Sequence, residues 1–260
     1  MTSVPHPGRV PSEIELDALL RRLNLANMRR VYRQVAARAE QDQWSYRDFL
    51  AMLVAEEVSH RKQTRLQRLT RHARFPYLKT IEDFDFTLQS SLRASLLGSY
   101  LGPDFVTEGR SLILTGKPGR GKTHLAVAIA YRAIQNGFDA YFTTAATLID
   151  DLSAAFREGQ LAQALPTYTH PAVLVDDLGM RKLPHTAAED LLEIIMRRYE
   201  RASTLITSNR PVDDWGKLLG DTAVTALLDR LLHHAHVLKC GPRSWRTKIQ
   251  TDLRTEAPVG

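Results

Sequence analysis

Hydrophobic and polar positions change their spacing along this chain near residue 80. Between residues 14 and 73 the apolar positions recur every three or four residues, as in Leu16, Leu20 and Leu23. Side chains with this spacing share one face of an α-helix, which can bury them against a neighbouring helix. The first 74 residues therefore predict a small all-helical domain.

The rest of the chain alternates short β-rich runs with helical ones. The predicted strands cover residues 111–115, 140–144, 172–176, 203–207 and 235–239. Strands and helices in alternation are typical of a parallel sheet that carries helices on both faces. We expect an α/β fold with a five-stranded parallel sheet flanked by helices.

The segment "FPYLKTIEDFDF", residues 75–86, separates the two patterns. Pro76 ends the preceding helix, because proline disfavours helical backbone in the residue before it. The rest of the segment has an extended pattern and is rich in aromatic side chains. We interpret residues 75–87 as a linker between an N-terminal domain, residues 1–74, and a larger domain, residues 88–260.

The positive charge of the chain is concentrated in its N-terminal third. Residues 1–80 hold 15 Lys and Arg against 8 Asp and Glu, whereas residues 81–260 hold 20 against 21. An excess of this kind suits a polyanionic partner, most often nucleic acid. A basic helix carries the side chains that we predict to contact DNA phosphates: Arg61, Lys62, Arg65 and Arg68. A solvated basic face without a partner is the alternative.

A glycine-rich loop stands between the first predicted strand and the helix after it. It fits the pattern G-x-x-x-x-G-K-[ST] in the context that a phosphate-binding P-loop requires. The N–H groups of such a loop surround the phosphates, its lysine reaches the β and γ phosphates, and its threonine hydroxyl binds Mg²⁺. We therefore expect ATP and Mg²⁺ as cofactors. The predicted nucleotide-binding residues are Gly116, Lys117, Pro118, Gly119, Arg120, Gly121, Lys122, Thr123 and His124.

Polar residues also come directly after two later strands. Asp176 ends the buried run "AVLVD" and is predicted to hold Mg²⁺ together with Thr123. Asp177 is predicted to orient or deprotonate the attacking water. Asn209 would project towards the γ-phosphate if its strand lies between the other two. The alternative for all three is that they only begin turns.

Arg230 lies within the apolar helical run "LLDRLL", where an arginine is poorly suited to packing. Two interpretations stay open at this point. The guanidinium pairs with a nearby acid such as Asp229, or it reaches the phosphate of a neighbouring subunit as an arginine finger.

Cysteine content and hydropathy bear on the compartment. Cys240 is the only cysteine, so neither a disulfide within the chain nor a cysteine-rich zinc site can form. No run approaches the roughly 18 consecutive apolar residues of a membrane span. We expect a cytoplasmic protein without a membrane partner.

The order of these motifs resembles that of the AAA+ ATPases. A closer resemblance is to the IstB family, the ATPase helper proteins of IstA/IstB-type bacterial insertion sequences, which are similar to the helicase loader DnaC. The segments that carry it are "FPYLKTIEDFDF", "GKPGRGKTHLAVAIA", "LVDDLG", "TLITSNRPVDDWG" and "ALLDRLLHHAHVL".

The resemblance implies an ATPase that forms homo-oligomers on double-stranded DNA with little sequence preference and activates an IstA-type transposase. It also implies roles for single residues. Lys122 and Thr123 correspond to Walker A, Asp176 and Asp177 to Walker B, Asn209 to sensor 1, and Arg230 to the finger that acts in trans.

Two other functions are compatible with the same motifs. One is a helicase loader of the DnaC type, whose DNA is single-stranded. The other is an ATP-binding assembly switch with little hydrolysis, because the second Walker B acid is commonly Glu and Asp177 is one methylene shorter. Arg243 and Arg246 are the candidates for a sensor 2 arginine or for a DNA contact.

Overall fold

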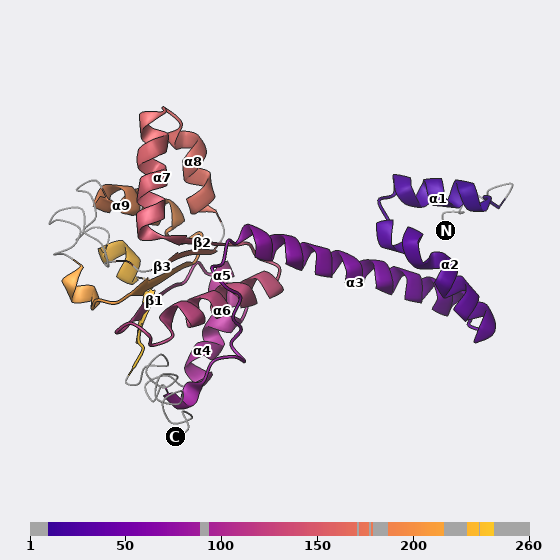
Figure 1. Ribbon diagram of the computed structural model, residues 1–260, viewed down its shortest axis with the longest axis horizontal. Coiled ribbons are helices and arrows are strands. Elements are labelled where there is room, and N and C mark those ends of the chain that lie inside the picture. The colour runs from indigo at the N-terminus through magenta and orange to yellow at the C-terminus, as the bar shows by residue number, and fades with distance from the viewer. Residues whose placement is uncertain are drawn as a thin grey trace, which may run out of the picture. The chain divides into compact units, whose positions relative to one another are not determined.

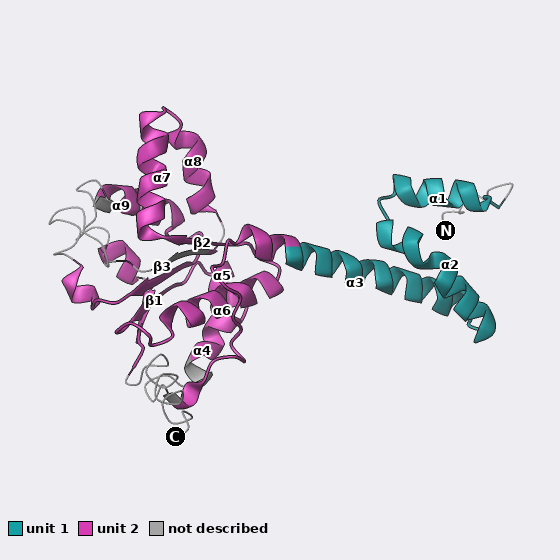
Figure 2. Cartoon of the chain, in the orientation of Figure 1, with its two compact units in different colours: residues 1–67 teal, residues 68–260 magenta. Residues whose placement is uncertain are grey.

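The computed structural model describes residues 10–88, 94–170, 172–176, 178, 187–215, 228–233 and 235–241. The chain divides into two compact units, residues 1–67 and 68–260, coloured teal and magenta in Figure 2. The division falls within helix α3 (Tyr46–His72), earlier than the boundary proposed at residue 74. The last turn of α3 belongs to the second unit because Ala73 is buried there, and its carbonyl accepts a 2.7 Å hydrogen bond from the Phe142 N–H.

The first unit contains α1 (Glu13–Arg22), α2 (Ala26–Gln41) and α3 up to residue 67. A capping box begins α1: the Ser12 hydroxyl accepts the Glu15 N–H, and the Glu15 carboxylate accepts the Ser12 N–H. One residue from each helix lies at the centre of the core, namely Leu20, Tyr32 and Leu53. The helical N-terminal region predicted from the spacing is confirmed.

The second unit is built on a sheet of five strands. They are β1 (Ser111–Thr115), β2 (Ala140–Thr144), β3 (Ala172–Asp176), β4 (Thr204–Ser208) and β5 (Ala235–Lys239). Their order across the sheet is β2-β3-β4-β1-β5, and each neighbouring pair is parallel. The parallel sheet predicted from the alternation is present, with β4 one residue later than expected.

Helices cover both faces of this sheet. Figure 1 shows α4 (Ala94–Leu101) and α6 (Lys122–Gln135) on one side, and α7 (Ala145–Arg157) and α8 (Leu161–Thr169) on the other. Ile113 and Ile206 pack into the core formed with α7, α8 and α9 (Ala187–Arg198). Because strand side chains alternate, the fully buried Leu112 and Leu205 face α6.

The other short elements are α5 (Asp104–Thr107), the 3₁₀ turns η1 (Phe86–Leu88) and η2 (Val212–Asp214), and a helical segment over residues 228–233. In the part of the chain that the structure describes, none of the helices combines the length and the apolar composition that a bilayer crossing requires.

The strand order brings distant residues to one edge. Since all strands run the same way, the residues that come after β1, β3 and β4 emerge at the carboxyl edge of the sheet, where open α/β sheets bind ligands. β4 lies between β1 and β3. This is the condition under which the sequence predicted that Asn209 would face the phosphate site.

Candidate functional site

The glycine-rich loop, residues 116–121, is fixed between β1 and α6 by main-chain contacts. The Gly116 N–H donates to the Ser208 carbonyl at 3.1 Å, and the Cys240 N–H donates to the Thr115 carbonyl at 2.7 Å. Gly116 has φ of 149°, and a Cβ on it would lie 2.3 Å from the Cys240 carbonyl oxygen. Only glycine fits so close a backbone approach.

Gly121 closes the loop in the left-handed conformation, with φ of 77°. A Cβ there would lie 2.6 Å from Cε2 of Phe84, so the Phe84 ring packs directly on the loop. The same ring meets His124 edge-on, with centroids 5.2 Å apart. The His124 Nε2 atom lies 2.9 Å from the Thr80 carbonyl. The side chain of His124 therefore faces the segment before the sheet, and its backbone N–H remains available at the start of α6.

The segment interpreted as a linker thus contributes to the wall of the loop. An ion pair of 2.5 Å between Glu82 and Arg132 attaches it to α6 as well. Aromatic content alone did not show this packing, because Phe84 and Gly121 are far apart in the chain. The segment belongs to the second unit rather than to a free connection.

Lys122 lies at the centre of the site and is only 7% exposed. Its Nζ donates to the Asn209 Oδ1 at 2.5 Å and to the Lys117 carbonyl at 3.2 Å. The lysine of the loop and the polar residue after β4 are therefore adjacent. A buried ammonium group beside a helix N-terminus and a glycine-rich loop is suited to a phosphate group.

Two residues at this edge are the candidates for a metal. Thr123 lies half-buried in the first turn of α6, and Asp176 is the last residue of β3. A hydroxyl and a carboxylate are oxygen ligands, which Mg²⁺ prefers. Asp177, Arg243 and Arg246 lie outside the described residues.

The main chain beyond Asp177 is anchored at the same edge. The Leu178 N–H donates to the Thr207 carbonyl at 3.0 Å, and the Ser208 hydroxyl donates to the Leu178 carbonyl at 2.6 Å. Asp176 and Leu178 therefore both lie beside the carboxyl end of β4.

Arg230 lies at the opposite edge of the sheet. It belongs to the helical segment 228–233, which precedes β5, and β5 pairs with β1 from Ala235 beside Ser111 to Lys239 beside Thr115. Five strand residues at about 3.3 Å each separate this edge from the P-loop by roughly 16 Å. Arg230 cannot contact a phosphate held by Lys122 of the same chain.

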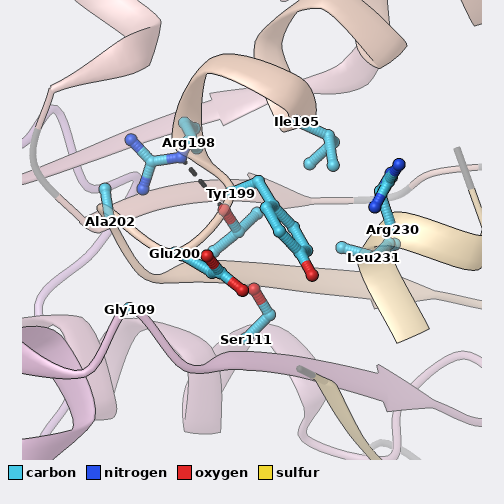
Figure 3. Close-up of a pocket in the computed structure, with 10 residues that line it drawn as sticks. Gly109, Ser111, Ile195, Arg198, Tyr199, Glu200, Ala202, Arg230 and Leu231 are labelled. Carbon is cyan, nitrogen blue, oxygen red and sulfur yellow. Dashed lines mark hydrogen bonds between the residues drawn. The ribbon is translucent and has the colours of Figure 1, made fainter. Parts of the chain in front are cut away.

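The surroundings of Arg230 bear on the interpretation that its guanidinium pairs with Asp229. Its guanidinium carbon lies 5.5 Å from the centroid of the Tyr199 ring. Among the described residues no ion pair joins it to Asp229. Figure 3 shows Arg230 and Tyr199 at a small cavity that is also lined by Gly109, Ser111 and Leu231.

Comparison with known proteins identifies the family. A family model described as IstB-like ATP binding protein matches residues 18–252. The chain belongs to the IstB-like ATP-binding protein family. The family that the motifs suggested is confirmed.

Relatives of this IstB-like protein are encoded by insertion sequences. The insertion sequence IS5376 protein of Geobacillus stearothermophilus, named for ATP binding, is 37% identical over 229 residues, which are 87% of this chain and 91% of that protein. The corresponding IS21 protein of Pseudomonas aeruginosa is 35% identical over 236 residues, which are 90% and 89% of the two chains.

Solved structures support the fold. The DnaC helicase loader aligns with a TM-score of 0.50 and 27% identity, over 67% of this chain and 99% of that one. AMPPCP-bound DnaA from Aquifex aeolicus aligns with a TM-score of 0.54 and 17% identity, over 70% of this chain and 56% of that one. The IstB-like chain therefore has the α/β P-loop fold of the AAA+ type, with helices preceding it.

Arg61 of the basic helix of this IstB-like protein has contacts within the first unit. The Arg61 guanidinium pairs with Glu57 at 2.8 Å and donates to the Asn24 carbonyl at 2.6 Å. Burial acts to raise the pKa of the Glu57 carboxyl, but hydrogen bonds from the Met28 N–H and from Arg61 outweigh it, and the pKa is lowered. Arg61 thus joins the turn after α1 to α3.

The other three predicted DNA contacts lie on α3 as exposed side chains. They are Lys62 and Arg65 in the first unit and Arg68 at the start of the second. All three side chains are exposed, so phosphate groups can reach them from solvent.

We expect Arg61→Gln to weaken the first unit without changing the salt dependence of DNA binding. Loss of the Glu57 and Asn24 contacts should cost about 1 kcal/mol, because the pair is half-exposed. Faster hydrogen exchange in α1 and α2 would report it. A salt slope lowered by about one unit would instead identify Arg61 as a phosphate contact.

Proposed function

We propose that this IstB-like protein binds and hydrolyses ATP, assembles on duplex DNA, and activates a partner transposase of the IstA type. The observation that carries the proposal is the division of catalytic groups between two edges of one sheet. Lys122 and Asn209 meet at the carboxyl edge, and Arg230 lies at the other. Each chain would therefore contribute the nucleotide-binding half of one catalytic site and the arginine of another. A neighbouring copy would complete each of these two sites.

The carboxyl edge would bind the nucleotide. The loop from Gly116 to Gly121 would donate N–H groups to the phosphates, Lys122 would contact the β and γ phosphates, and Asn209 would orient the attacking water. Thr123 and Asp176 would hold Mg²⁺, which neutralises charge on the phosphates when bound. Asp177 would accept a hydrogen bond from the water.

The amino edge would serve the next copy. An interface that joins the amino edge of one chain to the carboxyl edge of another is heterologous, so repeated copies form a ring or a helical filament. In such an assembly Arg230 stabilises the charge that develops on the γ-phosphate of its neighbour. ATP binding would then favour assembly, and hydrolysis would favour release.

The DNA and transposase parts of the proposal rest on charge and on the relatives. The relatives belong to insertion sequences, and the N-terminal third of this chain carries the excess positive charge. Contacts from arginine and lysine side chains to phosphates position a protein on the duplex and carry no sequence information. Duplex DNA, the transposase and ATP together imply a cytoplasmic protein.

Sedimentation with ATP and Mg²⁺, with duplex or single-stranded DNA, and with phosphate release followed in the same samples tests the proposal. Large assemblies on duplex DNA with coupled hydrolysis are expected. Preference for single strands would favour a helicase loader, for which the likeness to DnaC is the supporting observation. Assembly without hydrolysis would favour a nucleotide switch.

We expect the double variant Lys62→Gln and Arg65→Gln to weaken binding equally across duplex sequences. Each lost phosphate contact should lower the slope of log K against log salt by about 0.9, so the slope should fall by about 1.8. Anisotropy titrations at several salt concentrations measure it. The double variant Arg22→Gln and Arg47→Gln has the same charge loss on exposed positions of α1 and α3 and is the control. An equal effect of both pairs would place the DNA contacts elsewhere.

A further inference from the structure

The side chain of Arg230 lies over the ring of Tyr199, which in turn contacts His233; we call Tyr199 and His233 together the cradle. The Arg230 guanidinium lies over the Tyr199 ring at 5.5 Å from the centroid. The Tyr199 hydroxyl is hydrogen-bonded to the His233 Nδ1 at 2.7 Å, and the two rings stack with centroids 6.1 Å apart. Arg230 and His233 are three residues apart on segment 228–233. Tyr199, which follows α9, therefore contacts Arg230 at one end of a helical turn and His233 at the other.

Tyr199 is itself held in place by the end of α9. The Arg198 guanidinium before it is 1% exposed and donates to the Thr204 hydroxyl at 3.0 Å and to the Tyr168 carbonyl at 3.2 Å. It also donates to the carbonyls of His170 and Ser203. These bonds join the end of α9 to the end of α8 and the start of β4. The backbone that carries Tyr199 is therefore fixed at the amino edge.

An aromatic support suits an arginine that must act on another molecule. An ion pair with a carboxylate would occupy N–H donors and neutralise the charge. The face of a tyrosine ring attracts the cation but accepts none of its in-plane N–H groups, so the donors and the charge stay available. The ring also restricts the rotamers of a long side chain before the partner arrives.

We propose that Tyr199 is a positioning residue that holds Arg230 in the orientation in which it meets the nucleotide of the next copy. His233 orients Tyr199 through the hydroxyl and the stacked ring. The inference rests on the proposed trans action of Arg230 and extends it to two residues that touch no nucleotide. It predicts that the ring of Tyr199 matters more than its hydroxyl.

The test compares ATP turnover of Tyr199→Leu and Tyr199→Phe in assemblies on duplex DNA. Tyr199→Leu should lower kcat about tenfold, since a misplaced catalytic group loses most of its effect, with ATP affinity and sedimentation unchanged. Tyr199→Phe keeps the ring and should stay within about threefold of the parent. Tyr131→Leu, the same change at a half-buried tyrosine of α6, is the control and should have no effect.

Mixing experiments separate positioning from general damage to the fold. Subunits with Asp177→Asn keep an intact Tyr199 and Arg230 but should not hydrolyse ATP. Added to Tyr199→Leu subunits, they should restore turnover, because the intact cradle then faces an intact nucleotide site. No recovery in a mixture that still co-assembles would overturn the inference. If Tyr199→Leu does not fold, Tyr199→Gln, a polar change that also removes the ring at this half-buried position, provides the same comparison with the same loss of about tenfold.

The double variant Tyr199→Leu and Arg230→Ala separates the positioning role of Tyr199 from the trans action of Arg230. It should be no slower than Arg230→Ala alone, because both changes remove one function. Full turnover in Tyr199→Leu with loss in Arg230→Ala would overturn the cradle and leave the proposed function intact. Full turnover in Arg230→Ala would overturn the proposed trans site itself.

Discussion

Arg230→Ala should lower ATP turnover in DNA-bound assemblies by about 10³-fold and leave the ATP affinity of the single chain unchanged. An arginine finger contributes a factor of this size because it stabilises charge that appears only in the transition state. Its position at the amino edge, roughly 16 Å from the P-loop of its own chain, means that the effect must arise between copies. Phosphate release at saturating ATP, with nucleotide titration of the unassembled protein, measures both quantities.

Complementation between two inactive variants gives this prediction its control. Arg230→Ala subunits retain the nucleotide site, and Asp177→Asn subunits retain the arginine. Their mixture should hydrolyse ATP although each alone does not. A mixture that stays inactive while it co-assembles would mean that Arg230 acts within its own chain or only on structure.

Lys122→Ala should abolish ATP-dependent assembly by removing the nucleotide. The Nζ atom is buried and bonded to Asn209, so the variant loses a charged phosphate contact in a desolvated site. Truncating one partner of such a contact costs about 2–5 kcal/mol, which is a loss in ATP affinity of about 30-fold or more. Fluorescent-nucleotide titration and sedimentation with DNA report the two effects.

A matched variant shows whether the loss is specific to the site. Lys79→Ala removes the same charge from an exposed position of the same unit and should bind ATP normally. Retained assembly in Lys122→Ala would contradict the role assigned to the P-loop.

Local pattern was sufficient for most of the fold. Four of the five strands begin and end at the predicted residues, and β4 differs by one. Short apolar runs between polar helices define such strands without information from the rest of the chain. The P-loop was equally predictable, because its glycines, lysine and threonine are contiguous.

Side-chain partners were less predictable where they depend on distant segments. The basic character of Arg61 suggested DNA, but Glu57 one turn earlier and the Asn24 carbonyl engage it. Arg198 ends an amphipathic helix, where the pattern suggests a surface residue, yet it is buried. The packing of Phe84 on Gly121 joins positions that no periodic pattern connects.

The element types, the phosphate-binding loop and the family of this protein could be predicted from its amino-acid sequence. Which of these parts lie together became clear only from the folded chain. The strand order β2-β3-β4-β1-β5 places Asn209 beside Lys122 and leaves Arg230 at the far edge against Tyr199. This difference arises because hydrophobic periodicity and motif spacing depend on only a few neighbouring residues. The order of strands depends on the packing of the whole core, which brings together groups far apart in the chain.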